Sequence, residues 1–414
     1  MINLNEVNST KDVITKLFDG KGTFIEIHKL RSVGPNLLNR DENGNAKTIE
    51  FGGATRTVVS SQCRKAAIRA LETEYKTFRT RYVGELVADT IEDMYMDAST
   101  DYLRMADIVT QHVFEDVDEK NGRIKTVASV SNDDVMRIAN KIVEHFPLNE
   151  ESFYPYTKKK EFDAKNSDYA ALCEDLRELK NSSMVDYEIA MFGRMSTNSI
   201  IRSVDSAAFY NFAYTTNPAA GDSDYFIAQD TFKSAFDETE GKGAAHLNER
   251  DLCAGCYYSY AGIALTTYVE NILEGIDFKD KAQLKERLKK SVDYLLGVIE
   301  KTIMVMPSAM QHQMASYPDP DCVYVVLKRG VQNMTYDKAF EKPVYSDRTK
   351  SVAEKSVERL VNEANSSKFD TAKYLKRYWI GADDMTPNDT VSTTLKDMLE
   401  DMKEYFYEQI GLED

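Results

Sequence analysis

The 414-residue sequence is poor in cysteine and in long apolar runs. Its five cysteines are a sparse, odd number, which fits a protein kept in a reducing cytoplasm. No apolar run approaches the ~18 to 20 residues that cross a bilayer, and the N-terminus lacks the basic start and apolar stretch of a secretory signal. We therefore expect a cytoplasmic protein without a membrane partner. Its 42% of apolar residues suffices for one large domain with insertions, or for two or three smaller domains.

Motifs that carry catalytic or cofactor chemistry are also missing. The sequence has no GxxxxGK[ST] phosphate loop and no nucleophile elbow, although it leaves open a triad assembled from distant residues. Cys253 and Cys256 form a CxxC, but no second pair follows at zinc spacing and the motif precedes a tyrosine-rich strand. We interpret both as small buried thiols, and Asp41 as a turn residue. We expect no cofactor, no metal and no catalytic site.

Positive charge is in deficit, since 52 Lys and Arg face 68 Asp and Glu. The net charge of −16 argues against nucleic acid, because phosphate binding requires cations. Residues 51–71 are an exception, with no acid and four cations: Arg56, Arg64, Lys65 and Arg69. Net charge does not say where charges lie, so a basic strip on an acidic body and an ordinary acidic protein both remain open.

Hydrophobic periodicity predicts an α+β chain. Residues 61–79 read as a helix capped by Ser60 or Ser61, with Lys65, Arg69, Lys76 and Arg79 on one face. We expect further helix over most of 80–183, over 281–303 and after 344, and a long loop over 31–48. Residues 215–246 read as a protruding loop or hairpin. Strands are expected at 23–30, 185–192, 256–265 and 322–327. Without the insertions, this is the strand–helix–strand–strand–helix–strand order of a ferredoxin-like, RRM-like fold.

Three blocks of sequence then occur in order. The first comprises residues 27–28, 37–41, 51–53 and 60–62 with Arg56, Lys65 and Arg69; the second is 192–197; the third is 243–247 followed by 255–261. They resemble the N-terminal signature, the GRM segment and the GSAHL-plus-strand segment of the Cascade backbone family, the CasC or Cse-type RAMP proteins of type I-E CRISPR complexes.

The resemblance implies a right-hand shape. A palm (21–79, 184–213 and 248–345) carries a helical fingers insertion (80–183) and a thumb (214–247), flanked by an N-terminal extension (1–20) and a C-terminal helical region (346–414). Copies stack head to tail along a guide RNA, each thumb displaces every sixth base, and target DNA pairs with the rest. The implied partners are the guide RNA, target DNA, further copies of this chain and other Cascade subunits.

The RNA-binding residues that we predict contact the backbone and press on bases without reading sequence. Lys65 and Arg69 are one helical turn apart, and Ser61 lies at a helix N-terminus, which favours phosphate. Met195 and Leu247 offer apolar surfaces to bases. The full set is His28, Arg40, Lys47, Arg56, Ser60, Ser61, Gln62, Arg64, Lys65, Arg69, Arg194, Met195, Ser196, Tyr225, Phe226, His246 and Leu247. The run Lys158, Lys159 and Lys160 reads equally well as a target-DNA contact or a solvated loop.

Two other functions stay open. A type III-like backbone subunit cleaves target RNA, and Asp41 would be its suspect residue. A generic single-stranded RNA-binding protein would need the same basic strip and no assembly.

Overall fold

The computed structural model describes residues 2–72, 74–114, 118, 123–148, 167–196, 198–228, 246–330, 334–366 and 370–412. Its helices are η1 (Leu4–Glu6), α1 (Thr10–Phe18), α2 (Ser61–Arg69), α3 (Val83–Met94), α4 (Thr100–Val113), α5 (Asn132–His145), α6 (Ser167–Ser182), α7 (Tyr187–Phe192), α9 (Leu265–Leu273), α10 (Lys281–Met304), α11 (Gln311–Met314), η4 (Asp337–Phe340), α12 (Val352–Ser366) and α13 (Leu395–Ile410). Its strands are β1 (Thr23–Asn36), β2 (Thr48–Phe51), β3 (Ala54–Val59), β4 (Thr77–Thr80), β5 (Ala128–Ser131), β6 (Ala208–Tyr210), β7 (Ala213–Thr215), β8 (Asp222–Ala228), β9 (His246–Ala264), β10 (Cys322–Arg329), β11 (Lys373–Ile380) and β12 (Val391–Ser392).

A large mixed sheet organises the chain, in the order β12-β11-β10-β1-β9-β7-β3-β2. The central strand β1 pairs antiparallel with β10 on one side and with β9 on the other. β2 and β3 form a hairpin whose turn, Gly52-Gly53, has positive φ at both residues, as a type I′ turn requires. A Cβ atom on Gly52 would lie 1.6 Å from the carbonyl oxygen of Glu341, so only glycine fits there.

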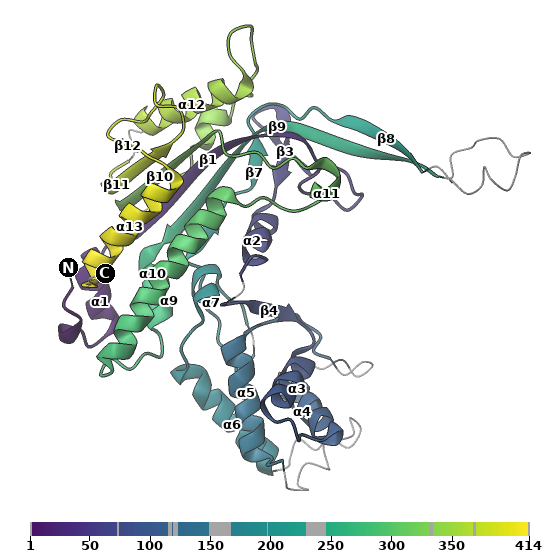
Figure 1. Ribbon diagram of the computed structural model, residues 1–414, viewed down its shortest axis with the longest axis vertical. Coiled ribbons are helices and arrows are strands. Elements are labelled where there is room, and N and C mark those ends of the chain that lie inside the picture. The colour runs from purple at the N-terminus through teal and green to yellow at the C-terminus, as the bar shows by residue number, and fades with distance from the viewer. Residues whose placement is uncertain are drawn as a thin grey trace, which may run out of the picture.

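Helices cover both faces of this sheet (Figure 1). Ile25 and Ile27 face a core shared with α1, α7, α9, α10 and α13, whereas Leu30 faces a second core shared with η4 and α12. Because β1 is buried on both faces, its polar residues must find partners inside. Glu26 and Lys328, each 1% exposed, form an ion pair at 2.8 Å.

The insertion between β4 and α7 has a hydrophobic core of its own. Side chains of α3, α4, α5 and α6 pack around residues such as Ile91 and Ile138, and β4 pairs with β5 beside them. Arg194, which follows α7, links this insertion to the rest of the chain, since its Nη1 lies 2.5 Å from Asp134 Oδ2 at the start of α5. Both side chains are buried.

β8 and the first half of β9 form a hairpin that extends away from the body (Figure 1). The two described strands of the expected protruding hairpin, residues 222–228 and 246–252, are therefore present and paired. Residues 229–245 lie outside the described residues.

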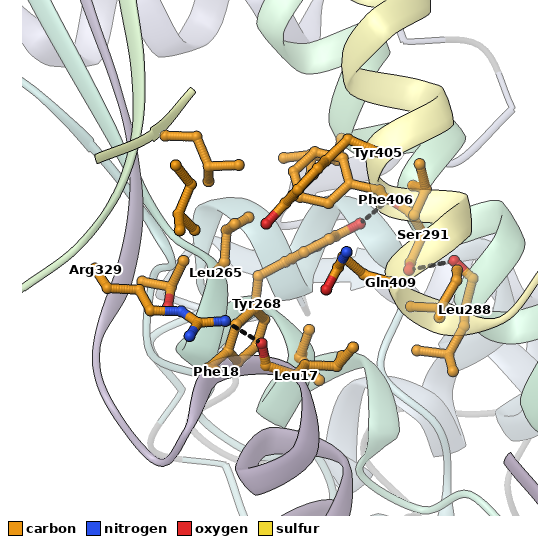
Figure 2. A pocket seen from close by; sticks show the side chains of 17 residues that line it. Leu17, Phe18, Leu265, Tyr268, Leu288, Ser291, Arg329, Tyr405, Phe406 and Gln409 are labelled. Carbon is orange, nitrogen blue, oxygen red and sulfur yellow. Dashed lines mark hydrogen bonds between the residues drawn. The ribbon is translucent and has the colours of Figure 1, made fainter. Parts of the chain in front are cut away.

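The N-terminal extension belongs to the core rather than standing apart from it. Val13, Leu17 and Phe18 of α1 are buried, and the amide of Ile2 donates to the carbonyl of Gln409 at 2.8 Å. Figure 2 shows a mostly apolar cavity between α1, α9, α10 and α13, where Arg329 donates to the carbonyl of Leu17 at 2.9 Å. Among the described helices, none has both the length and the apolar character needed to cross a membrane.

Several predicted elements are confirmed. The strands at 23–30, 256–265 and 322–327 and the helix at 281–303 are all present, and each of the three strands is part of a longer one. The α+β class is confirmed as well.

Four predictions of local structure were wrong. Residues 187–192, expected in a strand, form helix α7. The periodicity misled because all six residues are buried, so no polar face marks the helix in the sequence. The helix at 61–79 ends at Arg69, after which the carboxylate of Glu72 accepts the amides of Glu74 and Tyr75 in a turn toward β4. The loop over 31–48 begins only after β1 ends at Asn36. The C-terminal region adds β11 and β12 to the sheet between its helices.

Candidate nucleic-acid interface

Helix α2 is held at its N-terminus by its own cap and by the loop before β2. Ser60 Oγ accepts the amide of Cys63 at 3.3 Å, and the Ser60 amide donates to Asn39 Oδ1 at 2.9 Å. Ser60 is therefore a buried helix cap, which corrects its prediction as an RNA contact. Ser61 is half-buried and Gln62 and Arg40 are exposed, so these three remain available at the surface.

Five cations gather along this helix, and we call them the α2 strip: Lys47, Arg64, Lys65, Arg69 and Arg79. Burial, followed by the charges of Arg69 and Arg79, lowers the pKa of Lys65. Burial and Arg79 also lower the pKa of Arg69, against the opposing effect of Glu188. Lys65, Arg69 and Arg79 therefore repel one another, and a polyanion would relieve that repulsion.

Acidic groups near the strip are directed elsewhere. Glu72 makes an ion pair with Lys301 of α10 at 3.0 Å, and Glu188 accepts the amide of Thr77 at 3.2 Å. Within the described ranges, no residue of the strip forms an ion pair with a carboxylate. Net charge thus hid a surface on which positive charge is not neutralised.

Arg64 anchors the strip to the sheet. Its Nη1 donates to Asn211 O and Asn211 Oδ1, both at 2.8 Å, and to Tyr260 O at 2.9 Å. Burial lowers the pKa of Arg64 to about 10. We assign it a positioning role, because its bonds fix α2 against the segment that joins β6 to β7.

Two predicted RNA contacts are core residues instead. His28 is fully buried, stacks on Tyr336 with ring centroids 4.0 Å apart, and lies 3.1 Å from the hydroxyl of Tyr258. Burial lowers its pKa to about 3. Arg56 is 0% exposed and donates to the carbonyls of Thr215 and Phe340. Sequence periodicity did not reveal that His28 and Arg56 are buried, because helices cover both faces of the sheet and polar residues of its strands are buried too.

The GRM block divides into buried and exposed residues. Arg194 is buried in its pair with Asp134, where burial opposes ionisation of the carboxyl but the charges of Arg194 and Arg137 outweigh it and lower the pKa of Asp134. Arg194 is therefore a structural residue, which corrects its prediction as an RNA contact. Met195 is 92% exposed, and Ser196 is half-buried with its Oγ accepting the Asn198 amide at 3.1 Å.

On the hairpin, Tyr225 is 65% exposed and lies opposite Glu249 in the ladder. The backbones of Phe226, His246 and Leu247 belong to the same ladder. The side chains of these three residues lie outside the described structure, as do residues Lys158, Lys159 and Lys160.

Sequence reasoning missed two kinds of residue. Lys29 Nζ and Arg31 Nη2 each donate to the carbonyl of Ile303 at 2.8 Å, so they bind the C-terminal carbonyls of α10. Phe209 and Phe212 are exposed, and Lys47 Nζ lies 5.8 Å from the centroid of the Phe212 ring. Lys29 and Arg31 are two positions apart in β1, so strand alternation could have shown that they share one face. Nothing in the sequence separates the two phenylalanines from core residues.

Among the described residues, no three His, Cys, Asp or Glu side chains gather as a metal site requires. Cys253 and Cys256 are buried free thiols whose pKa values are raised by burial. Asp41 accepts the amides of Asn43 and Asn45, each at 2.9 Å, as a turn residue does.

The family model of the CT1975-like proteins matches residues 25–405, which is nearly the whole chain. The chain belongs to the CT1975-like protein family. The match therefore spans the large sheet, the helical insertion α3–α6 and the β8–β9 hairpin alike.

Solved structures share the fold. A chain of a "CRISPR RNA-guided surveillance complex, pre-nicking" is 20% identical with a TM-score of 0.70, over 93% of this chain and 100% of that chain. A chain of a "CRISPR RNA-guided surveillance complex" is 19% identical with a TM-score of 0.61, over 92% and 100%. No curated protein matches the sequence.

Proposed function

We propose that this protein is the guide-RNA-binding backbone subunit of a type I-E CRISPR surveillance complex, and that it polymerises along the spacer and presents it for pairing with target DNA. The proposal includes its partners: the guide, target DNA, other copies head to tail and other Cascade subunits. It also includes a cytoplasmic location and the division into palm, fingers and thumb.

The topology supports a ferredoxin-like palm. Four strands, β1, β7, β9 and β10, come in this order along the chain and lie in the sheet as β10-β1-β9-β7, antiparallel throughout. This arrangement is the one that the strand–helix–strand–strand–helix–strand order produces. The likeness to chains of CRISPR RNA-guided complexes over their full length supports the same assignment.

The α2 strip is the observation that carries the proposal. It places unneutralised cations on one surface of a protein whose net charge is −16. A subunit that lies along a nucleic acid needs positive charge only along that groove. Contacts of Lys65 and Arg69 with phosphate do not depend on sequence, as a protein that accepts any guide requires.

We propose a non-catalytic role. The turn bonds of Asp41 support its assignment as a loop residue, against the type III-like alternative.

The experiment measures the mass of complexes formed by the purified protein on single-stranded RNAs of increasing length and unrelated sequence. We expect copy number to rise in steps with RNA length, because a head-to-tail contact leaves the template to set the length. The RNA should stay intact in Mg²⁺. A fixed copy number would favour the generic RNA-binding protein, and cleavage lost in Asp41→Ala would favour the type III-like enzyme.

A further inference from the structure

A cleft between α2 and the C-terminal end of α10 is lined by three cations. Lys29 and Arg31 lie two positions apart in β1 and therefore share one face of the sheet, and Arg64 comes from α2. All three side chains line the same cleft. Lys29 is 7% exposed and Arg31 is 3% exposed, so most of this positive charge lies inside the protein.

Backbone carbonyls hold the two cations of β1 in place. Lys29 Nζ donates to the carbonyls of Thr302 and Ile303, each at 2.8 Å. Arg31 donates to the carbonyls of Ile303 and Met304, at 2.8 and 3.0 Å. Carbonyls carry no net charge, and the dipole of α10 supplies only about half a negative charge at this end. In the part of the chain that the structure describes, none of the three cations forms an ion pair with a carboxylate.

The positive charges therefore act on one another. Burial, followed by the charges of Arg31 and Arg64, lowers the pKa of Lys29. Burial also lowers the pKa of Arg31, against the opposing effect of acidic groups within residues 317–321. Arg31 Nε is buried and has no hydrogen-bond partner among the described residues. Because buried charge is costly unless it is paired, this cleft favours an anion.

We infer that the cleft binds a phosphate group, held by Lys29, Arg31 and Arg64. Arginine matches the oxygens of phosphate with its planar fork of donors, and lysine adds a point charge. The other walls are mostly apolar side chains such as Val33 and Val59, so opposite charges attract more strongly there than in water. The inference goes beyond the proposed function, because inorganic phosphate tests it without RNA.

Ser259 offers a direct test, since it lines the cleft and lies opposite Lys29 in the β1–β9 ladder. In the full-length protein, Ser259→Asp adds a carboxylate beside the cations, and Ser259→Asn is its neutral control of nearly equal size. Isothermal titration calorimetry with inorganic phosphate should show saturable binding to the wild type and to the asparagine variant. The aspartate variant should bind phosphate at least about tenfold more weakly, because its carboxylate pairs with the cations and repels the anion.

A second variant separates phosphate binding from support of α10. Arg31→Gln keeps a donor for the carbonyls of α10 and removes one charge, so it should weaken phosphate binding about tenfold. An unchanged phosphate affinity would show that Arg31 serves only α10 and would overturn the inference. Thermal melting verifies that each variant is folded, and Arg31→Gln carries the test by itself should Ser259→Asp unfold.

The α2 strip is the competing site for inorganic phosphate. If Lys65→Ala plus Arg69→Ala abolishes phosphate binding while Ser259→Asp leaves it intact, the anion binds the strip and the cleft assignment is wrong. Absence of saturable phosphate binding in the wild type would overturn the inference as well.

Single-stranded RNA identifies the source of the phosphate group. If RNA displaces bound phosphate from the wild type and Ser259→Asp also weakens RNA binding, the cleft holds a backbone phosphate. If RNA and phosphate bind together, the cleft holds the free ion. A wild type that binds phosphate but no RNA would contradict the proposed function alone, whereas one that binds RNA but no phosphate would contradict this inference alone.

Discussion

Neutralising two residues of the α2 strip should change how RNA binding depends on salt. Lys65 and Arg69 are half-buried and lie one helical turn apart. Neither forms an ion pair with a carboxylate among the described residues, although the charge of Glu188 acts on Arg69. For a single strand, each lost phosphate contact lowers the slope of log affinity against log salt by ~0.7. Lys65→Ala plus Arg69→Ala should therefore lower the slope by ~1.4. Between about 50 and about 200 mM salt, the affinity gap to wild type should narrow about sevenfold.

Filter binding at several salt concentrations, with RNAs of unrelated sequence, measures this slope. Lys285→Ala plus Lys289→Ala is the matched control, since both lysines are exposed and one turn apart on α10. The control removes as much charge and should leave the slope unchanged. An unaltered slope in the α2 variant, or an equal change in the control, would refute the assignment of the strip.

Three further predictions concern the core and the hairpin. Arg194→Met should destabilise the protein by ~3 to 5 kcal/mol in urea unfolding, because it leaves Asp134 buried without its partner, and Asp134→Asn should recover part of the loss. His28 has its pKa lowered to about 3 in the fold, so the unfolded chain takes up its proton first and stability is lost as pH falls below about 6.5. His28→Gln should reduce that slope by ~1.4 kcal/mol per pH unit, and an unchanged slope would contradict its burial. Tyr225→Ala plus Phe226→Ala should leave the subunit folded but impair assembly on guide RNA, and retention of a six-nucleotide reactivity period would contradict the thumb assignment.

The sequence predicted the elements that have one buried face or a strong apolar run. The stripe of α10 and the run of β10 were read correctly because burial there follows the periodicity. It failed at α7, whose residues are buried on every side, and at His28, whose strand is covered on both faces. Neither error shows in a single sequence, since both depend on elements from distant parts of the chain. The face of β1 that carries His28 is covered by α12, and α7 is buried against α9 and α10.

Three of the four cations predicted to share a face, Lys65, Arg69 and Arg79, do lie together, although for a different structural reason. A helix over 61–79 would have placed Arg79 on the same face as Lys65 and Arg69. The helix instead ends at Arg69, and strand β4 brings Arg79 back beside it, close enough to lower the pKa of Lys65. Lys65 and Arg69 are close together because they are neighbours on α2, whereas the turn between α2 and β4 brings Arg79 to them.

An acidic protein can bind a polyanion if the acids nearest the binding surface are used elsewhere. Glu72 follows α2 directly, yet it pairs with Lys301 and closes the turn, and Glu188 is bound by Thr77. Burial raises the pKa of Glu188, whereas its hydrogen bonds with Thr77 and the charge of Arg69 act in the opposite direction. Screening at physiological salt confines surface charge effects to about 8 Å, so acids beyond that distance oppose binding little. A net charge of −16 is therefore compatible with a basic groove, and the local pairing of Glu72 and Glu188 is what makes it so.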